Sequence, residues 1–338
     1  MTIPDEMVEA ARMDGCSQMR FFFDILVPIS KTNIAALFVI LFIIGWNQYL
    51  WPLLMVGTKK TAYWMTHLGL ICGVVLIFFP VWVAFVGSTV SQDDIIYPPL
   101  PLLPGPHLID NYANALFRGS PEGYGAKVPV IKMMMNSAIM AIGITVGKII
   151  ISLLSAFAFV YFRFPFRNLC FWLIFITLML PVEVRIVPTY EVVANLNLLN
   201  SYTGLIFPLI ASATATFLFR QFFMTIHDEM VEAARMDGCS PMRFFFDILV
   251  PISKTNIAAL FVILFIFGWN QYLWPLLMTT DPDMRTIVMA IDSMIPTGDD
   301  YAHWPTVMAT AMLAMVPPVI VVISMQKFFV KGLLESDK

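Results

Sequence analysis

Three charged residues within or beside apolar segments are the first candidates in this sequence for a functional site. Glu183 and Arg185 follow Pro181 at the end of one apolar run, and Lys148 lies inside another. A charge in a membrane-spanning segment is costly, so it is a functional hypothesis by default. The planar guanidinium of arginine donates paired hydrogen bonds to a phosphate group. One hypothesis is therefore that Arg185 faces a polar pathway and would meet the phosphate of a phosphate-bearing solute.

The same charges have structural alternatives. Glu183 or another acid can pair with Arg185 as a structural ion pair near the external surface. Lys148 can extend its charged end toward water, or pair with another group inside a bundle of helices. Sequence alone leaves these alternatives open.

A second polar group interrupts a later apolar run, where Asn270, Gln271 and Tyr272 are consecutive. Consecutive residues of a helix do not share a face, so the three side chains cannot all point into one pore. Polar side chains here either line a pore or join helices by hydrogen bonds. We take Asn270 and Tyr272 as candidates for a solute pathway, together with Arg185 and Glu183.

A third group of residues predicts a short helix–turn–helix elbow along the membrane surface. Asp228–Met236 reads as a helix with acidic residues in its first turn, where they complement the helix dipole. Gly238 follows the expected end of this helix, at the position where the backbone commonly adopts the left-handed conformation. Ser240 and Pro241 resemble the N-cap and first position of a second helix. Pro251 is expected to end that helix before the next apolar run.

Composition indicates the elements that must position these residues. Of 338 residues, 59% are hydrophobic and 13% are charged, whereas soluble domains are about half apolar and a quarter charged. Runs of about 20 apolar residues span a bilayer as helices, so the fold class expected is an all-α membrane protein. Residues 34–56 form one such run. The other six expected spans are about 68–90, 136–162, 168–188, 201–223, 255–280 and 304–328, with the elbow at 224–254.

The N-terminal segment is a near-duplicate of the elbow region. Residues 1–54 repeat residues 224–277 almost letter for letter, and one of the few differences is Ile44 in place of Phe267. We expect residues 1–54 to be a non-native or non-functional extension, Met55 to be the natural start, and residues 55–338 to be the working domain. With six spans, Lys and Arg are denser on the elbow side, which predicts a cytoplasmic elbow and C-terminus.

The sequence lacks the motifs that are typical of several other functional classes. No G-x-x-x-x-G-K-[ST] run is present, so the chain is not expected to bind ATP. The four histidines and four cysteines have no metal-ligand spacing, so we expect neither a metal nor another cofactor. Scattered histidines argue against an enzyme, and the lack of Asp or Glu in the spans proper argues against a secondary transporter. The net charge of −3 gives no sign of nucleic-acid binding.

The pattern Glu232-Ala233-Ala234-x-x-Asp237-Gly238, followed by Pro251, resembles the EAA loop of permease subunits of bacterial ABC importers. The resemblance extends from Met55 to the end of the chain. Three stretches, 175–185, 211–223 and 268–277, look like permeases of sn-glycerol-3-phosphate importers.

The resemblance implies the six-helix type I importer fold, called MetI-like, in the bacterial inner membrane. It implies an elbow that docks on an ATP-binding subunit and turns ATP-driven closure into helix movement. It also implies a second permease subunit, a dimer of ATP-binding subunits that hydrolyse the ATP, and a periplasmic solute-binding protein. The solute implied is sn-glycerol-3-phosphate or a glycerophosphodiester, with a sugar as the alternative.

Overall fold

The computed structural model describes residues 59–99, 101–118, 128–177, 182–295 and 302–335. Side chains at 59–63, 65–66, 182–183 and 327–335 are not described. The expected extension 1–54, and with it the apolar run 34–56, lies outside the described residues. The chain divides into two compact units, Met1–Phe79 and Pro80–Lys338. Of the first unit, the structure describes the beginning of one long helix.

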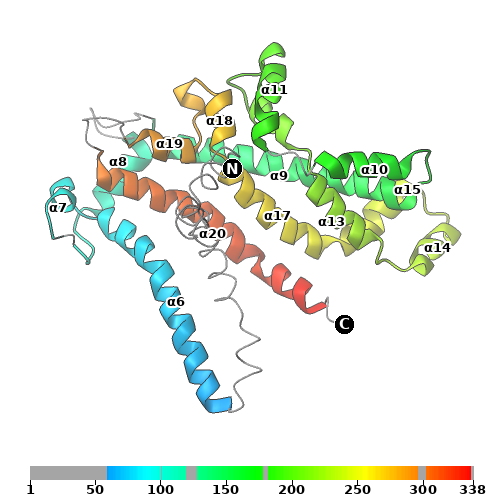
Figure 1. Ribbon diagram of the computed structural model, residues 1–338, viewed down its shortest axis with the longest axis horizontal. Coiled ribbons are helices and arrows are strands. Elements are labelled where there is room, and N and C mark those ends of the chain that lie inside the picture. The colour runs from blue at the N-terminus through cyan, green and yellow to red at the C-terminus, as the bar shows by residue number, and fades with distance from the viewer. Residues whose placement is uncertain (1–58, 100, 119–127, 178–181, 296–301, 336–338) are drawn as a thin grey trace, which may run out of the picture. The chain divides into compact units, whose positions relative to one another are not determined.

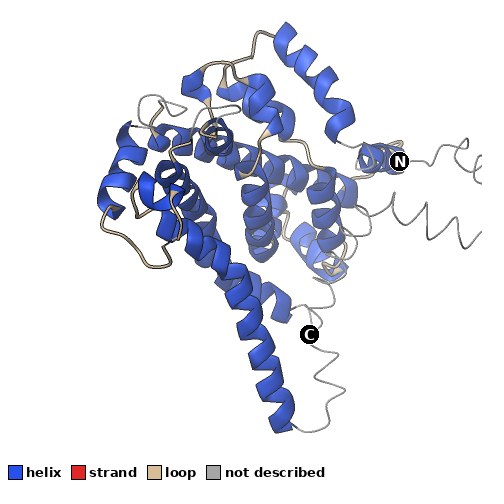
Figure 2. Ribbon diagram, turned by 60° about the vertical axis from the view of Figure 1, so that its left-hand side comes forward, coloured by secondary structure: helices blue, strands red, loops and turns tan. Residues whose placement is uncertain are grey.

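The described residues form helices joined by turns and contain no strand (Figure 2). In chain order the elements are α6 (Lys59–Gly87), α7 (Gln92–Ile96), α8 (Leu108–Arg118), α9 (Val130–Tyr161), α10 (Arg167–Ile176), α11 (Val182–Asn195), α12 (Tyr202–Ile206), η3 (Phe207–Leu209), α13 (Ala213–Phe223), α14 (Asp228–Met236), α15 (Pro241–Phe244), the π-helix η4 (Phe245–Leu249), α16 (Val250–Ile252), α17 (Lys254–Trp269), α18 (Leu273–Met278), η5 (Pro282–Met284), α19 (Ile287–Ser293) and α20 (Trp304–Glu335).

Three described segments are long and apolar enough to cross a membrane, namely His67–Gly87, Val130–Tyr161 and Trp304–Gln326. Two bent pairs of helices are also long and apolar enough when each pair is counted as one span. They are Tyr202–Leu209 with Ala213–Phe223, bent by 48°, and Pro241–Ile252 with Lys254–Trp269, bent by 72°. The chain is therefore a multi-pass helical membrane protein. The third expected span, 168–188, covers α10 and the start of α11, and the boundaries of all six spans stay a prediction.

Within the second unit, α9 is the central helix. It packs against α13 and α17, and α17 packs in turn against α20 (Figure 1). Small residues allow the close approach: a Cβ on Gly268 of α17 would lie 3.0 Å from Cα of Ala141 on α9. Gly147 likewise lies under Ile210. Helices in membranes associate by such close packing, because lipid supplies no hydrophobic driving force.

Polar contacts tie the N-terminal end of α9 to the loop after α18. The side-chain amide of Asn136 donates to the carbonyl oxygens of Asp283, at 2.8 Å, and Arg285, at 2.9 Å. Tyr202 donates its hydroxyl to Oδ1 of Asn136 at 2.6 Å. Asn136 is almost fully buried, so these hydrogen bonds replace water that the site excludes. One side chain thus joins α9, α12 and the loop.

Asn136→Ala is expected to lower the unfolding free energy by about 1 to 2 kcal/mol, because it leaves two carbonyls and one hydroxyl without their partner. Tyr202→Phe removes one of the three hydrogen bonds and should have a smaller effect. Thermal unfolding of the purified protein in one detergent measures both. Equal melting temperatures for the two variants would contradict the bridging role of Asn136.

Candidate functional site

The first arm of the elbow ends in the predicted left-handed turn. Helix α14 is capped at its C-terminus by Asp237, and Gly238 has φ of 69°. The Gly238 N–H donates to the Arg235 carbonyl at 3.0 Å, and the Cys239 N–H donates to the Ala234 carbonyl at 2.9 Å. This pair of bonds is the Schellman motif, which satisfies the free carbonyls of a helix end. The prediction for Gly238 is confirmed.

The second arm begins as expected, with Ser240 accepting a hydrogen bond from the Arg243 N–H at 3.4 Å and Pro241 in the first turn. Its end differs from the prediction, since Pro251 does not end the helix. The last helical residue is Ile252, and a 72° bend follows at Ser253. Proline lacks an N–H and crowds the carbonyl four residues earlier. The wider π-helix η4 precedes it and accommodates both effects.

The elbow rests on the C-terminal end of α9. Phe157 and Tyr161 of α9 lie against Phe245 and Phe244, with ring centroids 5.0 Å and 5.4 Å apart. Ala234 is buried in the same cluster, and a cavity of about 90 Å³ is lined by Phe157, Tyr161, Ala234 and Phe244, among others. Figure 1 shows α14 and α15 at this end, with α8 and α19 at the other. The elbow is therefore in direct contact with α9 and continues into α17.

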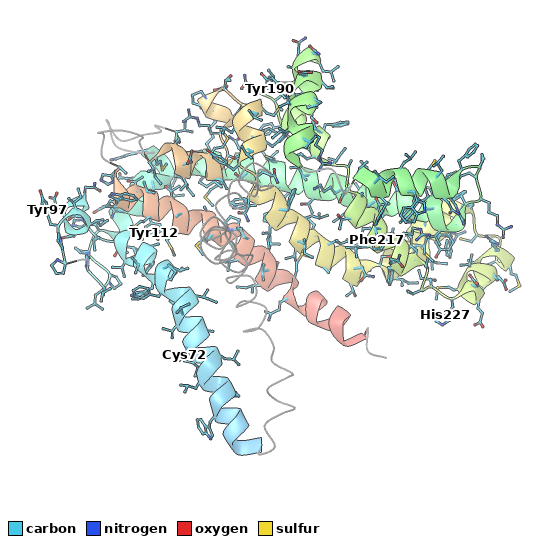
Figure 3. The ribbon with its side chains drawn as sticks, viewed as in Figure 1. Cys72, Tyr97, Tyr112, Tyr190, Phe217 and His227 are labelled. Atoms are coloured by element: carbon cyan, nitrogen blue, oxygen red, sulfur yellow. The ribbon has the colours of Figure 1, made fainter. Side chains whose placement is uncertain are left out.

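The outer surface of α14 is open. Glu232, Ala233 and Asp237 are exposed, and Met236 is 84% exposed. His227, labelled in Figure 3, precedes the helix and is exposed as well. An exposed helix with a small alanine at its centre can be approached closely by another protein.

Two of the charged candidates, Lys148 and Arg185, come from α9 and α11. Lys148 is buried within the bundle, and its Nζ lies 4.3 Å from the centre of the Phe267 ring. Arg185, on α11, is exposed and close enough for its charge to act on Lys148. Among the described residues, no carboxylate lies within ion-pair distance of either cation. The side chain of Glu183 lies outside the described residues, so its pairing with Arg185 stays a prediction.

Asn270, Gln271 and Tyr272 do not form part of a continuous helix. They are the break between α17, which ends at Trp269, and α18, which begins at Leu273. Tyr272 donates to Oδ2 of Asp292 at 2.7 Å and so joins α18 to α19. Asn270 is exposed and has no side-chain hydrogen bond in the described part of the chain. Broken helices at membrane depth occur where the freed backbone lines a cavity or is buried in protein.

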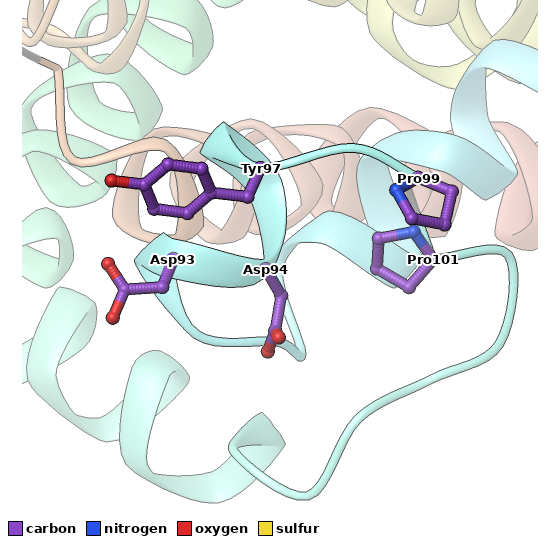
Figure 4. A pocket seen from close by; sticks show the side chains of 5 residues that line it. All are labelled: Asp93, Asp94, Tyr97, Pro99 and Pro101. Carbon is purple, nitrogen blue, oxygen red and sulfur yellow. The ribbon is translucent and has the colours of Figure 1, made fainter.

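An open cavity of about 310 Å³ beside α7 is lined by acidic and aromatic groups, among them Asp93, Asp94 and Tyr97 (Figure 4). Hydrogen bonds from the side chain and backbone of Ser91 hold the pKa of Asp94 below its ordinary value, because they stabilise the carboxylate form. Ionised carboxylates repel phosphate, so this cavity is not an anion site. The described residues contain no cluster of His, Cys, Asp and Glu suited to a metal.

Residues 1–91 and 115–335 match the family described as "Binding-protein-dependent transport system inner membrane component". The chain belongs to this family of ABC importer permeases. It is 57% identical over 278 residues to the "sn-glycerol-3-phosphate transport system permease protein UgpE" of Escherichia coli O1:K1 / APEC, covering 81% of this chain and 98% of the relative. The protein of the same name from Yersinia pestis bv. Antiqua (strain Antiqua) is 58% identical over 284 residues, covering 84% of this chain and 100% of the relative.

A solved structure has the same fold, with a TM-score of 0.67 and 19% identity over 80% of this chain and 98% of that chain. Its title is "Crystal structure of a bacterial ABC transporter involved in the import of the acidic polysaccharide alginate". The fold class predicted from sequence, an all-α MetI-like permease, is confirmed.

The sequence interpretation of the permease did not identify Phe267 as the neighbour of Lys148. It also did not identify Asp292, which fixes Tyr272. The two residues of each pair are separated in sequence, so no local pattern connects them.

Proposed function

We propose that this permease subunit carries sn-glycerol-3-phosphate, or a glycerophosphodiester, into the cytoplasm. The observation that supports the proposal is identity of 57% and 58% to permeases named for sn-glycerol-3-phosphate, across nearly their whole length. The exposed Arg185 beside the buried Lys148 gives the chain the cationic chemistry that a phosphate ester requires.

The proposal includes the partners that an ABC importer needs. A second permease subunit completes the pore, a dimer of ATP-binding subunits hydrolyses the ATP, and a periplasmic protein delivers the solute. The chain itself needs no cofactor and works as a non-enzymatic part of the complex. Its C-terminus and its elbow lie on the cytoplasmic side of the inner membrane.

The elbow is the proposed docking surface for the ATP-binding subunits. Glu232, Ala233 and Asp237 present an exposed surface, Ala234 anchors that surface to α9, and Gly238 sets the angle between the two arms. Pro251 lies in the last turn before the bend that leads into α17. Closure of the ATP-binding subunits would thereby move the helices that line the pathway.

In the proposed solute pathway, Arg185 meets the phosphate and Asn270 offers a free amide to the solute hydroxyls. Glu183 balances the charge of Arg185, and Tyr272 holds the end of the broken span through Asp292. These roles follow from the chemistry of the side chains, since cations and amide groups are the ordinary partners of a phosphate ester.

Uptake of labelled sn-glycerol-3-phosphate tests the function. Cells lacking their own importer are supplied with this chain and its partner subunits, and uptake is compared with cells that lack this chain alone. We expect uptake that depends on this chain and on ATP, and that is unchanged by uncouplers in the first minute. A complex that assembles and hydrolyses ATP without this uptake would contradict the solute and favour a sugar. Failure to associate with an ATP-binding subunit would contradict the importer function.

A further inference from the structure

We propose that Lys148 is a second cationic ligand for the phosphate group of the solute and that it acts together with Arg185. The inference rests on the proposed function for the kind of solute, a phosphate monoester. It assigns the anion site to one place: the surroundings of Lys148 on α9, next to Phe267 of α17 and within reach of the charge of Arg185 on α11. Three side chains define this cationic site, namely Lys148, Arg185 and Phe267.

The burial of Lys148 is the first argument. The residue is 7% exposed, and the described residues place no carboxylate within ion-pair distance of it. Its described neighbour is the ring of Phe267, whose centre is 4.3 Å from Nζ. A cation–π contact offsets less of the desolvation cost than an anion does. The buried ammonium of Lys148 therefore lacks an anionic partner among the described residues, and a bound anion would supply one.

The nearness of Arg185 is the second argument. Ile144, one turn before Lys148 on α9, and Ile186, next to Arg185 on α11, pack in one apolar cluster. The charge of Arg185 consequently acts on Lys148. Two neighbouring cations repel each other, and a dianion between them turns that repulsion into attraction. A purely structural pair would have the opposite charge at one of the two positions.

The third argument is that Nζ of Lys148 is accessible from outside the helix bundle. Among the described residues, Oγ1 of Thr286 is the side-chain polar atom that is both enclosed and without a hydrogen bond. Nζ of Lys148 has no hydrogen bond either, so it still reaches accessible surface. Phe267 is 46% exposed, which leaves one side of the cationic site open. The ammonium is therefore not fully enclosed by the described residues.

The chemistry selects the class of ligand. A phosphate monoester carries nearly two negative charges at neutral pH, which matches one ammonium and one guanidinium. Arginine binds two phosphate oxygens through its planar fork, and lysine acts as a compact point charge. An uncharged polyol has no oxygen that compensates either cation. The cationic site therefore distinguishes sn-glycerol-3-phosphate from glycerol and from neutral sugars.

A binding measurement on the purified complex tests the inference without the solute-binding protein. The complex is titrated with sn-glycerol-3-phosphate, with inorganic phosphate and with glycerol, and binding is detected as a ligand-dependent rise in melting temperature. Lys148→Met is expected to weaken binding of both phosphates at least about tenfold, the effect of one charged hydrogen bond. Lys148→Arg should bind phosphate within about threefold of the wild type, because the charge is retained.

Lys132→Met is the matched control. It makes the same substitution on the same helix, but Lys132 is an exposed residue paired with Asp283 at 2.8 Å, near the opposite end from the elbow. Its phosphate affinity should equal that of the wild type. Glycerol should bind none of the four proteins.

The melting temperature without ligand separates a binding role from a structural one. Lys148→Met removes a buried charge that lacks an anionic partner, so the unliganded complex should melt at a higher temperature than the wild type. If Lys148 served only to hold the bundle together, the same variant would melt at a lower temperature.

Two results would overturn the inference: equal phosphate affinity in wild type and Lys148→Met, or no phosphate binding by the wild type. Neither result bears on uptake, which is measured separately in cells. Phosphate binding that needs Lys148, in a complex that takes up no sn-glycerol-3-phosphate, would uphold the cationic site and reject the proposed solute.

Discussion

Gly238→Val is expected to reduce solute uptake about tenfold or more while the amount of protein in the membrane stays within about twofold of the wild type. At φ of 69°, a β-branched residue is strained by about 1 to 2 kcal/mol, and the strain is relieved when the residue leaves the left-handed region. The Gly238 and Cys239 N–H groups would then lose their bonds to Arg235 and Ala234. The angle between the two arms of the elbow would change, and with it the fit to the ATP-binding subunits.

Gly238→Asn is the matched control, because asparagine enters the left-handed region more readily than other residues that carry a side chain. It should retain most of the uptake. Steric overlap cannot explain the difference, since a Cβ at this position would meet no atom within 4 Å. Uptake measured alongside ATP hydrolysis by the assembled complex tests the proposal: valine should leave hydrolysis in place but uncouple it from uptake. Equal uptake by the two variants would contradict a role for the turn geometry.

Gly204→Ala is expected to destabilise the fold by about 1 to 3 kcal/mol, a large effect for the addition of one methyl group. A Cβ on Gly204 would overlap the carbonyl oxygen of Leu198, which is a backbone atom. Ser201 fixes the same turn, since its Oγ donates to that carbonyl at 2.6 Å and accepts from the Gly204 N–H at 3.1 Å. The backbone would therefore have to shift, and the N-terminal cap of α12 would be lost.

Gly143→Ala provides the comparison. A Cβ there would also lie too close to a neighbour, 2.6 Å from Cδ1 of Ile206. That neighbour is the end of a flexible side chain, which can change rotamer. Thermal unfolding in detergent should show a clearly larger loss for Gly204→Ala than for Gly143→Ala. A loss of equal size would mean that the turn before α12 adapts as easily as a side chain does.

The elbow could be predicted in detail because its signals are local. The left-handed turn at Gly238 and the cap at Ser240 each depend on residues within five positions of one another. The bend at Ser253 could not be predicted, because η4 and α16 together carry the chain past Pro251. The wider η4 occurs where Phe245 packs against Phe157 of α9, a tertiary contact that no local sequence pattern indicates.

The arrangement of the proposed solute pathway was harder to predict from the sequence than that of the elbow. The polar residues Asn270, Gln271 and Tyr272 interrupt the apolar run at 255–280, but they did not show that α17 would stop at Trp269 instead of continuing as one span. The environment of Lys148 depends on Phe267 and Arg185, which come from α17 and α11. Residue types indicated that these charges mattered. Their arrangement required the packing of three helices.

The bend at Ser253 makes α17 a lever. Its pivot is a buried serine whose hydroxyl donates to the Leu249 carbonyl. The 16 residues of α17 form an arm of roughly 24 Å at 1.5 Å per residue. A rotation of roughly 10° at the elbow, acting through that rigid arm, would displace its far end by about 4 Å. That end is the break at Asn270 beside the proposed pathway, so a small turn at the proposed docking surface would be enough to change the width of a passage for one small solute.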